Sequence, residues 1–233
     1  MMKKFFLTVS AIAAVCFSAA AADKSNLDWE RPQYRTYTIF NLGILPKIPG
    51  WQDNTETIGI KTGWPVVTGK NATMIGFESS WAYSGSEYMT GVQGSMLMNY
   101  NKHGEGFEAA IGLNFSSRSF VGMQASCVFN LANNLVGVQA GALNICRTMD
   151  GFQPGVIGNI TEESAGCQAG LFSITKVLKG CQVGGLNLAK DSTDGFQIGF
   201  FNIASGGKGL QFGLVNIIPG GKIPFMLFFN MSK

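Results

Sequence analysis

The stretch GFQIG at residues 195–199 decides the fold, because it returns as GLQFG at residues 209–213. Upstream, the same phrase occurs as GVQAG at 137–141, GFQPG at 151–155, GCQAG at 166–170 and GCQVG at 180–184. Its central Gln residues are spaced alternately 14 and 15 residues apart. Self-similarity at a short period is the sequence signature of a repeat architecture.

A degraded form of the phrase extends toward the N-terminus, weakly as far as Asn41. Each copy has a polar residue at its centre, which we call the slot, and a small residue two positions later. The slot residues are Lys61, Glu78, Gln93, Glu108, Gln124, Gln139, Gln153, Gln168, Gln182, Gln197 and Gln211. The repeats predict one β domain over residues 37–233, preceded by an N-terminal extension over 23–36.

Within each copy, Gly and Gln alternate with apolar residues, which is the period of a β-strand. Polar or Gly-rich breaks between the copies are turn chemistry. One strand per repeat predicts an all-β, up-and-down antiparallel β-barrel of about 12–14 short strands. The alternation of 14 and 15 suits hairpins with two kinds of turn. A β-solenoid with one coil per repeat, in which the slot residues form a ladder, is the alternative.

Two features favour the barrel. Charged slot residues suit a polar lumen better than a dry solenoid interior, so we expect all slot residues to face the lumen. The opposite face is almost uncharged, as a lipid-facing surface requires. One feature opposes a wide channel: after the second Gly the row placed on the inner face is apolar (Leu143, Phe172, Leu186, Phe201, Val215), which implies either a narrow lumen packed near its ends or the solenoid.

Residues 1–22 have the three parts of a secretory signal peptide: Lys3 and Lys4, an apolar run, and small residues ending at Ala22. After it, no apolar run reaches the roughly 18 residues of a membrane helix. Of 233 residues, 31 are Gly and 13% are charged, and the net charge is +3. This composition argues against a disordered chain and against a nucleic-acid partner.

Few residues suggest chemistry. The single His, His103, is expected in a solvated turn, and a lone His does not make a metal site. Without a catalytic constellation, we predict no enzyme activity, no catalytic residues, no metal site and no cofactor. Cys167 and Cys181 stand one residue before Gln and are interpreted as small apolar residues of the outer face, with a disulfide between neighbouring strands as the alternative.

The tandem Gly-x-Gln-x-Gly-x-x-Asn units after a signal peptide, clearest over residues 137–216, resemble a largely uncharacterised family of bacterial surface-repeat proteins. The resemblance implies a location at the cell surface or outer membrane and no catalytic residues. We therefore expect an exported outer-membrane barrel of structural or narrow-pore type, with membrane lipid as its partner. The alternative function is that of a secreted surface solenoid acting as an adhesion or interaction module. No protein partner follows from the sequence.

Overall fold

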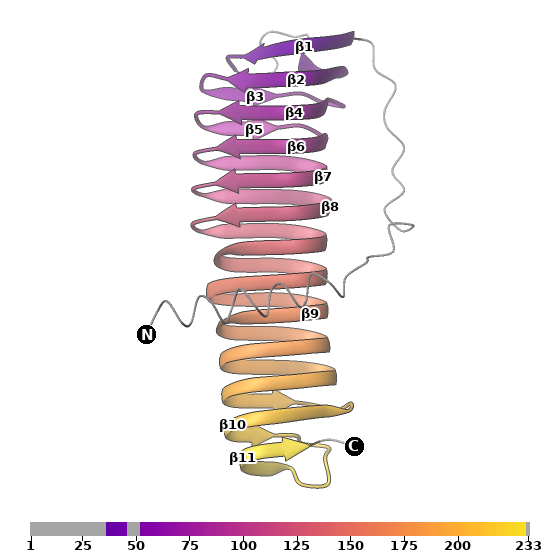
Figure 1. The fold of residues 1–233 in the computed structure, drawn as a ribbon, viewed down its shortest axis with the longest axis vertical. Helices are drawn as coiled ribbons and strands as arrows, with labels where there is room; N and C mark the ends of the chain where they lie inside the picture. The colour runs from indigo at the N-terminus through magenta and orange to yellow at the C-terminus, as the bar shows by residue number, and fades with distance from the viewer. Residues whose placement is uncertain (1–35, 46–51, 232–233) are drawn as a thin grey trace. The chain divides into compact units, whose positions relative to one another are not determined.

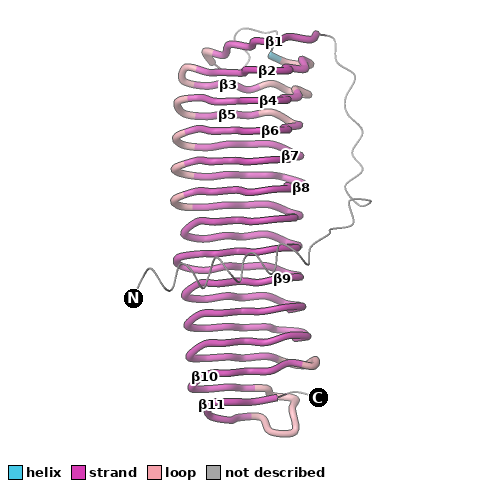
Figure 2. The backbone as a smooth tube through the Cα atoms, viewed as in Figure 1, coloured by secondary structure: helices cyan, strands magenta, loops and turns pink. Residues whose placement is uncertain are grey.

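The computed structural model describes residues 36–45 and 52–231, in which strands alternate with short turns; no α-helix occurs there, and the short helical segment in Figure 2 is a 3₁₀ turn at Gln52. The predicted signal peptide and nearly all of the N-terminal extension lie outside these residues. The strands are β1 (Thr36–Gly43), β2 (Thr55–Gly63), β3 (Val66–Thr68), β4 (Thr73–Ser80), β5 (Tyr83–Gly85), β6 (Tyr88–Ser95), β7 (Met98–Ala110), β8 (Leu113–Ser126), β9 (Phe129–Ala204), β10 (Gly209–Ile217) and β11 (Phe225–Met231). The all-β prediction is confirmed.

The described residues belong to two compact units. The N-terminal unit comprises those up to 134 together with Gln139–Ala142. The C-terminal unit comprises Leu135–Val138 and the described residues from 143 onward.

In the N-terminal unit, the strands that carry the slot residues are neighbours in one parallel row (Figure 1). β1, β2, β4, β6, β7 and β8 follow in that order, and the register places Lys61 opposite Glu78 and Glu78 opposite Gln93. A second parallel row contains β3, β5 and the first residues of β7. One repeat is thus one coil: a slot strand, a short turn, a second strand and a return.

The C-terminal unit repeats this arrangement within β9, whose long run contains the strands of successive coils. β10 pairs with the end of β9 in parallel, and Gln211 lies opposite Gln197. β11 then pairs with β10 in the antiparallel sense. Each unit is therefore a β-solenoid.

The predicted antiparallel barrel is wrong, and the alternative is right. Neighbouring slot strands are parallel, and each repeat contributes two strands rather than one. The alternation of 14 and 15 had favoured hairpins, but a coil absorbs the extra residue in a turn. Asn159 follows Gln153 by six residues whereas Asn202 follows Gln197 by five, and both Asn side chains still join the same kind of stacked column.

Both Gly residues of the phrase are needed where neighbouring coils approach each other closely, and each has a further constraint of its own. The first, such as Gly166 with φ +140°, has a backbone conformation that disfavours a side chain, and a Cβ there would overlap the carbonyl oxygen of Gly151. A Cβ at the second, such as Gly199, would overlap the carbonyl oxygen of Gly184 and would also lie 2.6 Å from Nδ2 of Asn187, so this Gly leaves room for the Asn column as well. The phrase therefore encodes the stacking of coils.

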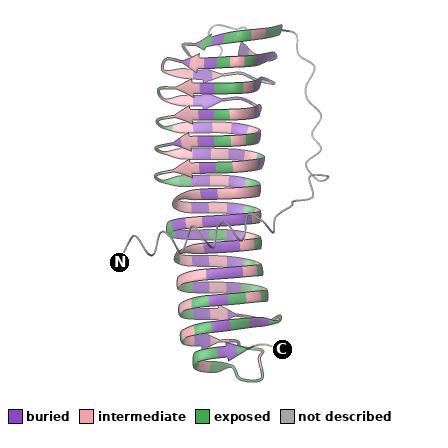
Figure 3. Ribbon diagram, viewed as in Figure 1, coloured by how far each residue is buried: buried purple, intermediate pink, exposed green. Residues whose placement is uncertain are grey.

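Buried and exposed residues alternate along the coils (Figure 3). The buried residues are mainly polar, and many large apolar side chains are exposed. The strands alternate between the two environments, as their period of two requires. In β10, for example, Gln211 is buried while Leu210 and Phe212 are exposed. This arrangement turns the usual distribution of polar and apolar residues inside out.

Candidate interaction surface

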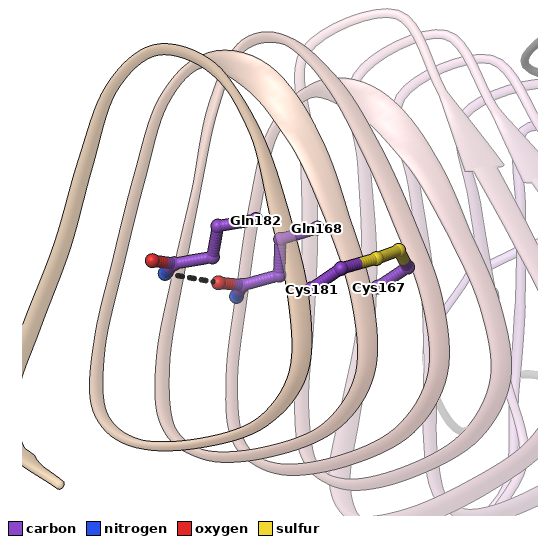
Figure 4. The surroundings of a disulfide bond; sticks show 4 residues. All are labelled: Cys167, Gln168, Cys181 and Gln182. Atoms are coloured by element: carbon purple, nitrogen blue, oxygen red, sulfur yellow. Dashed lines mark hydrogen bonds between the residues drawn. A yellow bond between two sulfur atoms is a disulfide. The ribbon is translucent and has the colours of Figure 1, made fainter. Parts of the chain in front are cut away.

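The predicted slot residues all lie in the interior, and none is more than 1% exposed. In the C-terminal unit, the slot glutamines from Gln168 onward each donate a hydrogen bond from Nε2 to Oε1 of the slot glutamine in the preceding coil, as Figure 4 shows for Gln182 and Gln168. The N···O distances are 3.0 Å for Gln168–Gln153, 2.9 Å for Gln182–Gln168, 2.7 Å for Gln197–Gln182 and 2.8 Å for Gln211–Gln197. Gln139 bonds Gln124 in the same way in the N-terminal unit, at 2.7 Å. The slot residues therefore face the interior as predicted, but they form a hydrogen-bonded ladder within a solenoid and do not line the lumen of a barrel.

A second ladder runs through the Asn that ends the phrase. Nδ2 of Asn187 donates to Oδ1 of Asn202 at 2.8 Å and also to the carbonyl oxygen of Ile198 at 3.0 Å. Asn202 repeats both bonds with Asn216 and the carbonyl of Phe212. Because buried polar groups are costly unless they are hydrogen-bonded, the two ladders explain why this interior tolerates amides.

The charged slot pair Lys61 and Glu78 is neutralised internally. Nζ of Lys61 lies 3.6 Å from Oε2 of Glu78 and donates to Oγ of Ser86 at 2.7 Å and to the carbonyl of Gly85 at 3.1 Å. Oγ of Ser86 in turn donates to Oε2 of Glu78 at 2.5 Å. Burial lowers the pKa of Lys61, and the Glu78 carboxylate opposes that shift. The pair therefore belongs to the core.

Glu108 has a different environment, since its slot neighbours are amides. Its carboxyl oxygens accept hydrogen bonds from Nε2 of Gln124 at 2.7 Å and from Nδ2 of Asn101. Burial raises the pKa of Glu108 to about 8. The side chain is thus a neutral carboxylic acid at neutral pH, and a neutral acid, like Gln, offers both a donor and an acceptor.

His103 lies within β7 rather than in a solvated turn, so that prediction is wrong. Its Nδ1 hydrogen-bonds Oγ of Ser119 at 2.7 Å, and its ring stacks on Tyr88 with a centroid separation of 5.3 Å. Burial lowers the pKa of His103, which favours the neutral ring. Nowhere in the described residues do three or more His, Cys, Asp or Glu side chains gather as metal ligands would.

Cys167 and Cys181 form a disulfide between adjacent coils, next to the hydrogen-bonded pair Gln168 and Gln182 (Figure 4). Their Cα atoms are 4.6 Å apart, within the usual range for a disulfide. The alternative left open by the sequence is therefore correct, and neighbouring coils of the C-terminal unit are covalently linked.

The surface outside the coils shows a segregation that the sequence analysis missed. In the N-terminal unit, the turns that follow β2, β4, β6, β7 and β8 have two residues each and carry no charge, and residues 44–45 after β1 are uncharged as well. We call this column of turns the apolar edge. It consists of residues 44–45 (IL), 64–65 (WP), 81–82 (WA), 96–97 (ML), 111–112 (IG) and 127–128 (CV). Its large side chains are exposed, with Trp64 at 72% and Leu97 at 63%.

The C-terminal unit has an apolar edge at the same place in its coils. The residues three and four positions after each slot Gln are 156–157 (VI), 171–172 (LF), 185–186 (GL), 200–201 (FF) and 214–215 (LV). Val156 is 82% exposed and Leu171 and Phe200 are each 61% exposed. Leu186 and Phe201, predicted for the inner face, are exposed as well, so that part of the prediction is wrong.

Most exposed charged side chains lie at the other end of the coil, where the chain passes from the second strand to the next slot strand. We call this column the charged edge. It contains ion pairs between neighbouring coils: Lys102–Glu87 at 2.7 Å, Arg147–Glu162 at 3.2 Å and Lys176–Glu162 at 2.8 Å. The Lys176 ammonium lowers the pKa of Glu162, although both groups are exposed to solvent. Each unit is therefore amphipathic across the width of its coils.

The sequence feature that could have indicated the apolar edge is the pair of residues, nearly all of them apolar, that follows every Gly-x-Gln-x-Gly phrase. A barrel places them within a strand, whereas a coil makes them a turn. The segregation thus becomes visible only when the coil is known.

Comparisons with family models, with curated proteins and with solved structures found no match to this chain. Among the described residues, no helix is long and apolar enough to cross a membrane.

Proposed function

We propose that the protein is an exported, non-catalytic surface β-solenoid that acts as an interaction module through its apolar edge. The observation that supports this function is the segregation of exposed apolar turns from the charged edge in both units. Exposed apolar patches of this extent are typical of binding surfaces. The signal-like residues 1–22 and the resemblance to surface-repeat proteins support export.

The interior supports the same reading, because most hydrogen bonds of its slot side chains are made to groups inside the coils. Glutamine ladders, the Lys61–Glu78 pair and Glu108 use their hydrogen-bonding capacity on neighbouring coils. A catalytic group needs to reach a substrate, and these groups are buried. A partner can therefore be contacted only by side chains of the outer surface.

The experiment compares two triple variants of the full chain, expressed with its own N-terminus in a bacterium with an outer membrane. The apolar-edge variant is Leu171→Ser, Phe200→Ser and Leu214→Ser, and the charged-edge variant is Lys179→Ser, Lys190→Ser and Lys208→Ser; all six residues are exposed. Protease treatment of intact cells measures surface display, and fractionation measures retention in the cell envelope.

We expect all three proteins to be exported and the wild type and charged-edge variant to stay with the envelope. The apolar-edge variant is expected in the soluble fraction or the medium. Equal retention of all three proteins, or absence of the wild type from the cell surface, contradicts the proposed function.

A further inference from the structure

We infer that the apolar edge binds the surface of a lipid bilayer, with its turn side chains inserted among the lipids and the charged edge left in water. The inference rests on the proposed function and names the partner of the same surface. It is argued from three properties of the edge: its chemistry, its backbone and its surroundings.

The chemistry of the edge is uniform. Its turns consist of aliphatic and aromatic residues, Pro, Gly, Ala and Cys, and contain no charged side chain. A protein interface combines an apolar centre with a polar rim, and its fit depends on individual side chains. Two apolar residues that recur on coil after coil give a partner protein few distinct side chains to recognise, whereas a fluid lipid phase requires no specific side-chain fit.

The backbone of the edge is already satisfied, as a lipid environment demands. In the N-terminal unit, turn amides donate to carbonyl oxygens of the preceding coil: Trp64 to Gly43 at 3.0 Å, Ala82 to Pro65 at 2.8 Å, and Leu97 to Ala82 at 3.0 Å. In the C-terminal unit, the edge residues up to Phe201 lie inside β9. The turns can therefore enter an apolar phase without exposing unpaired donors to it.

The exposed apolar area extends from the edge onto the outer face of the slot strand. Outward residues of that strand are also apolar and exposed, such as Phe77 and Val92 in one unit and Phe196 and Phe212 in the other. At the start of the edge, Trp64 and Trp81 lie with their ring centroids 6.0 Å apart. Trp prefers the boundary between lipid and water. The charged edge, at the opposite end of the coil, is compatible with the aqueous side.

The test uses full-length wild-type protein and vesicles of phosphatidylcholine, a zwitterionic lipid. Because the edge carries no charge, we expect binding to change less than about threefold between low and high salt. The apolar-edge variant is expected to bind about 100-fold more weakly, since three exposed large apolar side chains are lost. The charged-edge variant is expected to bind within about threefold of the wild type.

A second measurement begins with the wild type alone, so its first result does not depend on the folding of any variant. Vesicles containing brominated lipid are expected to quench the fluorescence of the wild type, and to quench less in the variant Trp64→Phe, Trp81→Phe. Circular dichroism confirms that each variant retains its β-structure. Wild type that fails to float with vesicles, or an equal loss of binding in both triple variants, overturns the inference.

A concentration-dependent dimer without vesicle binding, abolished in the apolar-edge variant, would identify a second copy of the chain as the occupant and also overturn it. The outcome is distinguishable from failure of the proposed function. If the apolar-edge variant is lost from the cell envelope but the wild type does not bind vesicles, the proposed interaction function is supported and lipid is excluded as the partner. If wild type binds vesicles through the edge while the variant stays in the envelope, the proposed function fails.

Discussion

The two units use the same slot for different chemistry. In the C-terminal unit, the slot is Gln from residue 153 to 211, and each amide bonds the preceding one. In the N-terminal unit, the slot includes Lys61, Glu78 and Glu108. Both columns are fully buried, so the coil does not select a residue type at this position. What the slot residues share is at least one hydrogen bond or ion pair with a neighbouring coil.

The difference has a thermodynamic consequence. A ladder of identical amides is insensitive to pH, and the loss of one rung affects its immediate neighbours. A column with ionisable groups depends on the pairing of charges and on protonation. The first two predictions break the column of the N-terminal unit, and the last two act on the C-terminal unit.

Replacing Lys61→Met removes the cation from the buried pair and leaves the Glu78 carboxylate inside the coil. Breaking a buried ion pair in this way costs about 3–5 kcal/mol. We expect the free energy of unfolding of the N-terminal unit, measured by hydrogen exchange and urea titration, to fall by that amount. The double variant Lys61→Met, Glu78→Gln should recover most of the loss, because no charge remains buried. Equal destabilisation by both variants would argue against the pair as the cause.

Glu108 makes stability depend on pH. Its pKa is 4.5 in the reference state and about 8 in the fold, so folding takes up a proton between these values. The stabilisation is complete below the lower value and is lost as pH rises through the upper one. We expect the free energy of unfolding to fall by up to about 4 kcal/mol between pH 5 and pH 8. In Glu108→Gln this contribution should vanish, because Gln is the residue that the slot carries elsewhere. A variant with an unchanged pH slope would contradict the assignment.

Much of the architecture could be predicted from the sequence, and the reasons for the errors are physical. The period of the Gly-x-Gln-x-Gly phrase correctly indicated strands and placed the slot residues on one face. The direction of pairing could not be read from it, because parallel and antiparallel strands share the period of two. Charge at Lys61, Glu78 and Glu108 argued for a wet lumen, since a single sequence does not show that Ser86 and Gln124 satisfy these groups.

The apolar edge was hidden by the same ambiguity. The alternation of the strand places Phe200 outward but Phe201 inward, and only the path of the coil turns Phe201 outward as well. The disulfide could be predicted only as an alternative. Two Cys at equivalent repeat positions meet only when neighbouring strands are in register, and the sequence does not show that register.

The disulfide distinguishes the C-terminal unit further. Cys167→Ala with Cys181→Ala opens a link between residues 14 apart, which corresponds to about 3 kcal/mol in the loop-entropy description. We expect a loss of this size in the free energy of unfolding of the C-terminal unit under oxidising conditions. Cys127→Ala, at an exposed free cysteine of the apolar edge, is the control and should change stability by less than about 0.5 kcal/mol. A similar loss in reduced wild type would support the assignment, whereas an unaltered double variant would refute it.

The smallest expected effect comes from the one rung of the Asn ladder that is missing in the C-terminal unit. Ser173 stands between Asn159 and Asn187, and within the described residues neither Oγ of Ser173 nor Oδ1 of Asn187 has a hydrogen-bond partner. Gly184 already occupies the position that gives each Asn its space in other coils.

Ser173→Asn should therefore complete the ladder. The new amide can accept from Nδ2 of Asn159 and donate to Oδ1 of Asn187, which removes an unsatisfied buried acceptor. We expect a gain of about 1 kcal/mol in the free energy of unfolding, with slower hydrogen exchange in the coils on both sides. Ser173→Ala separates this effect from simple removal of an unpaired hydroxyl, because it leaves Oδ1 of Asn187 unpaired. If Ala stabilises as much as Asn, continuity of the ladder contributes nothing, and the regularity of the C-terminal column has to be attributed to its glutamines alone.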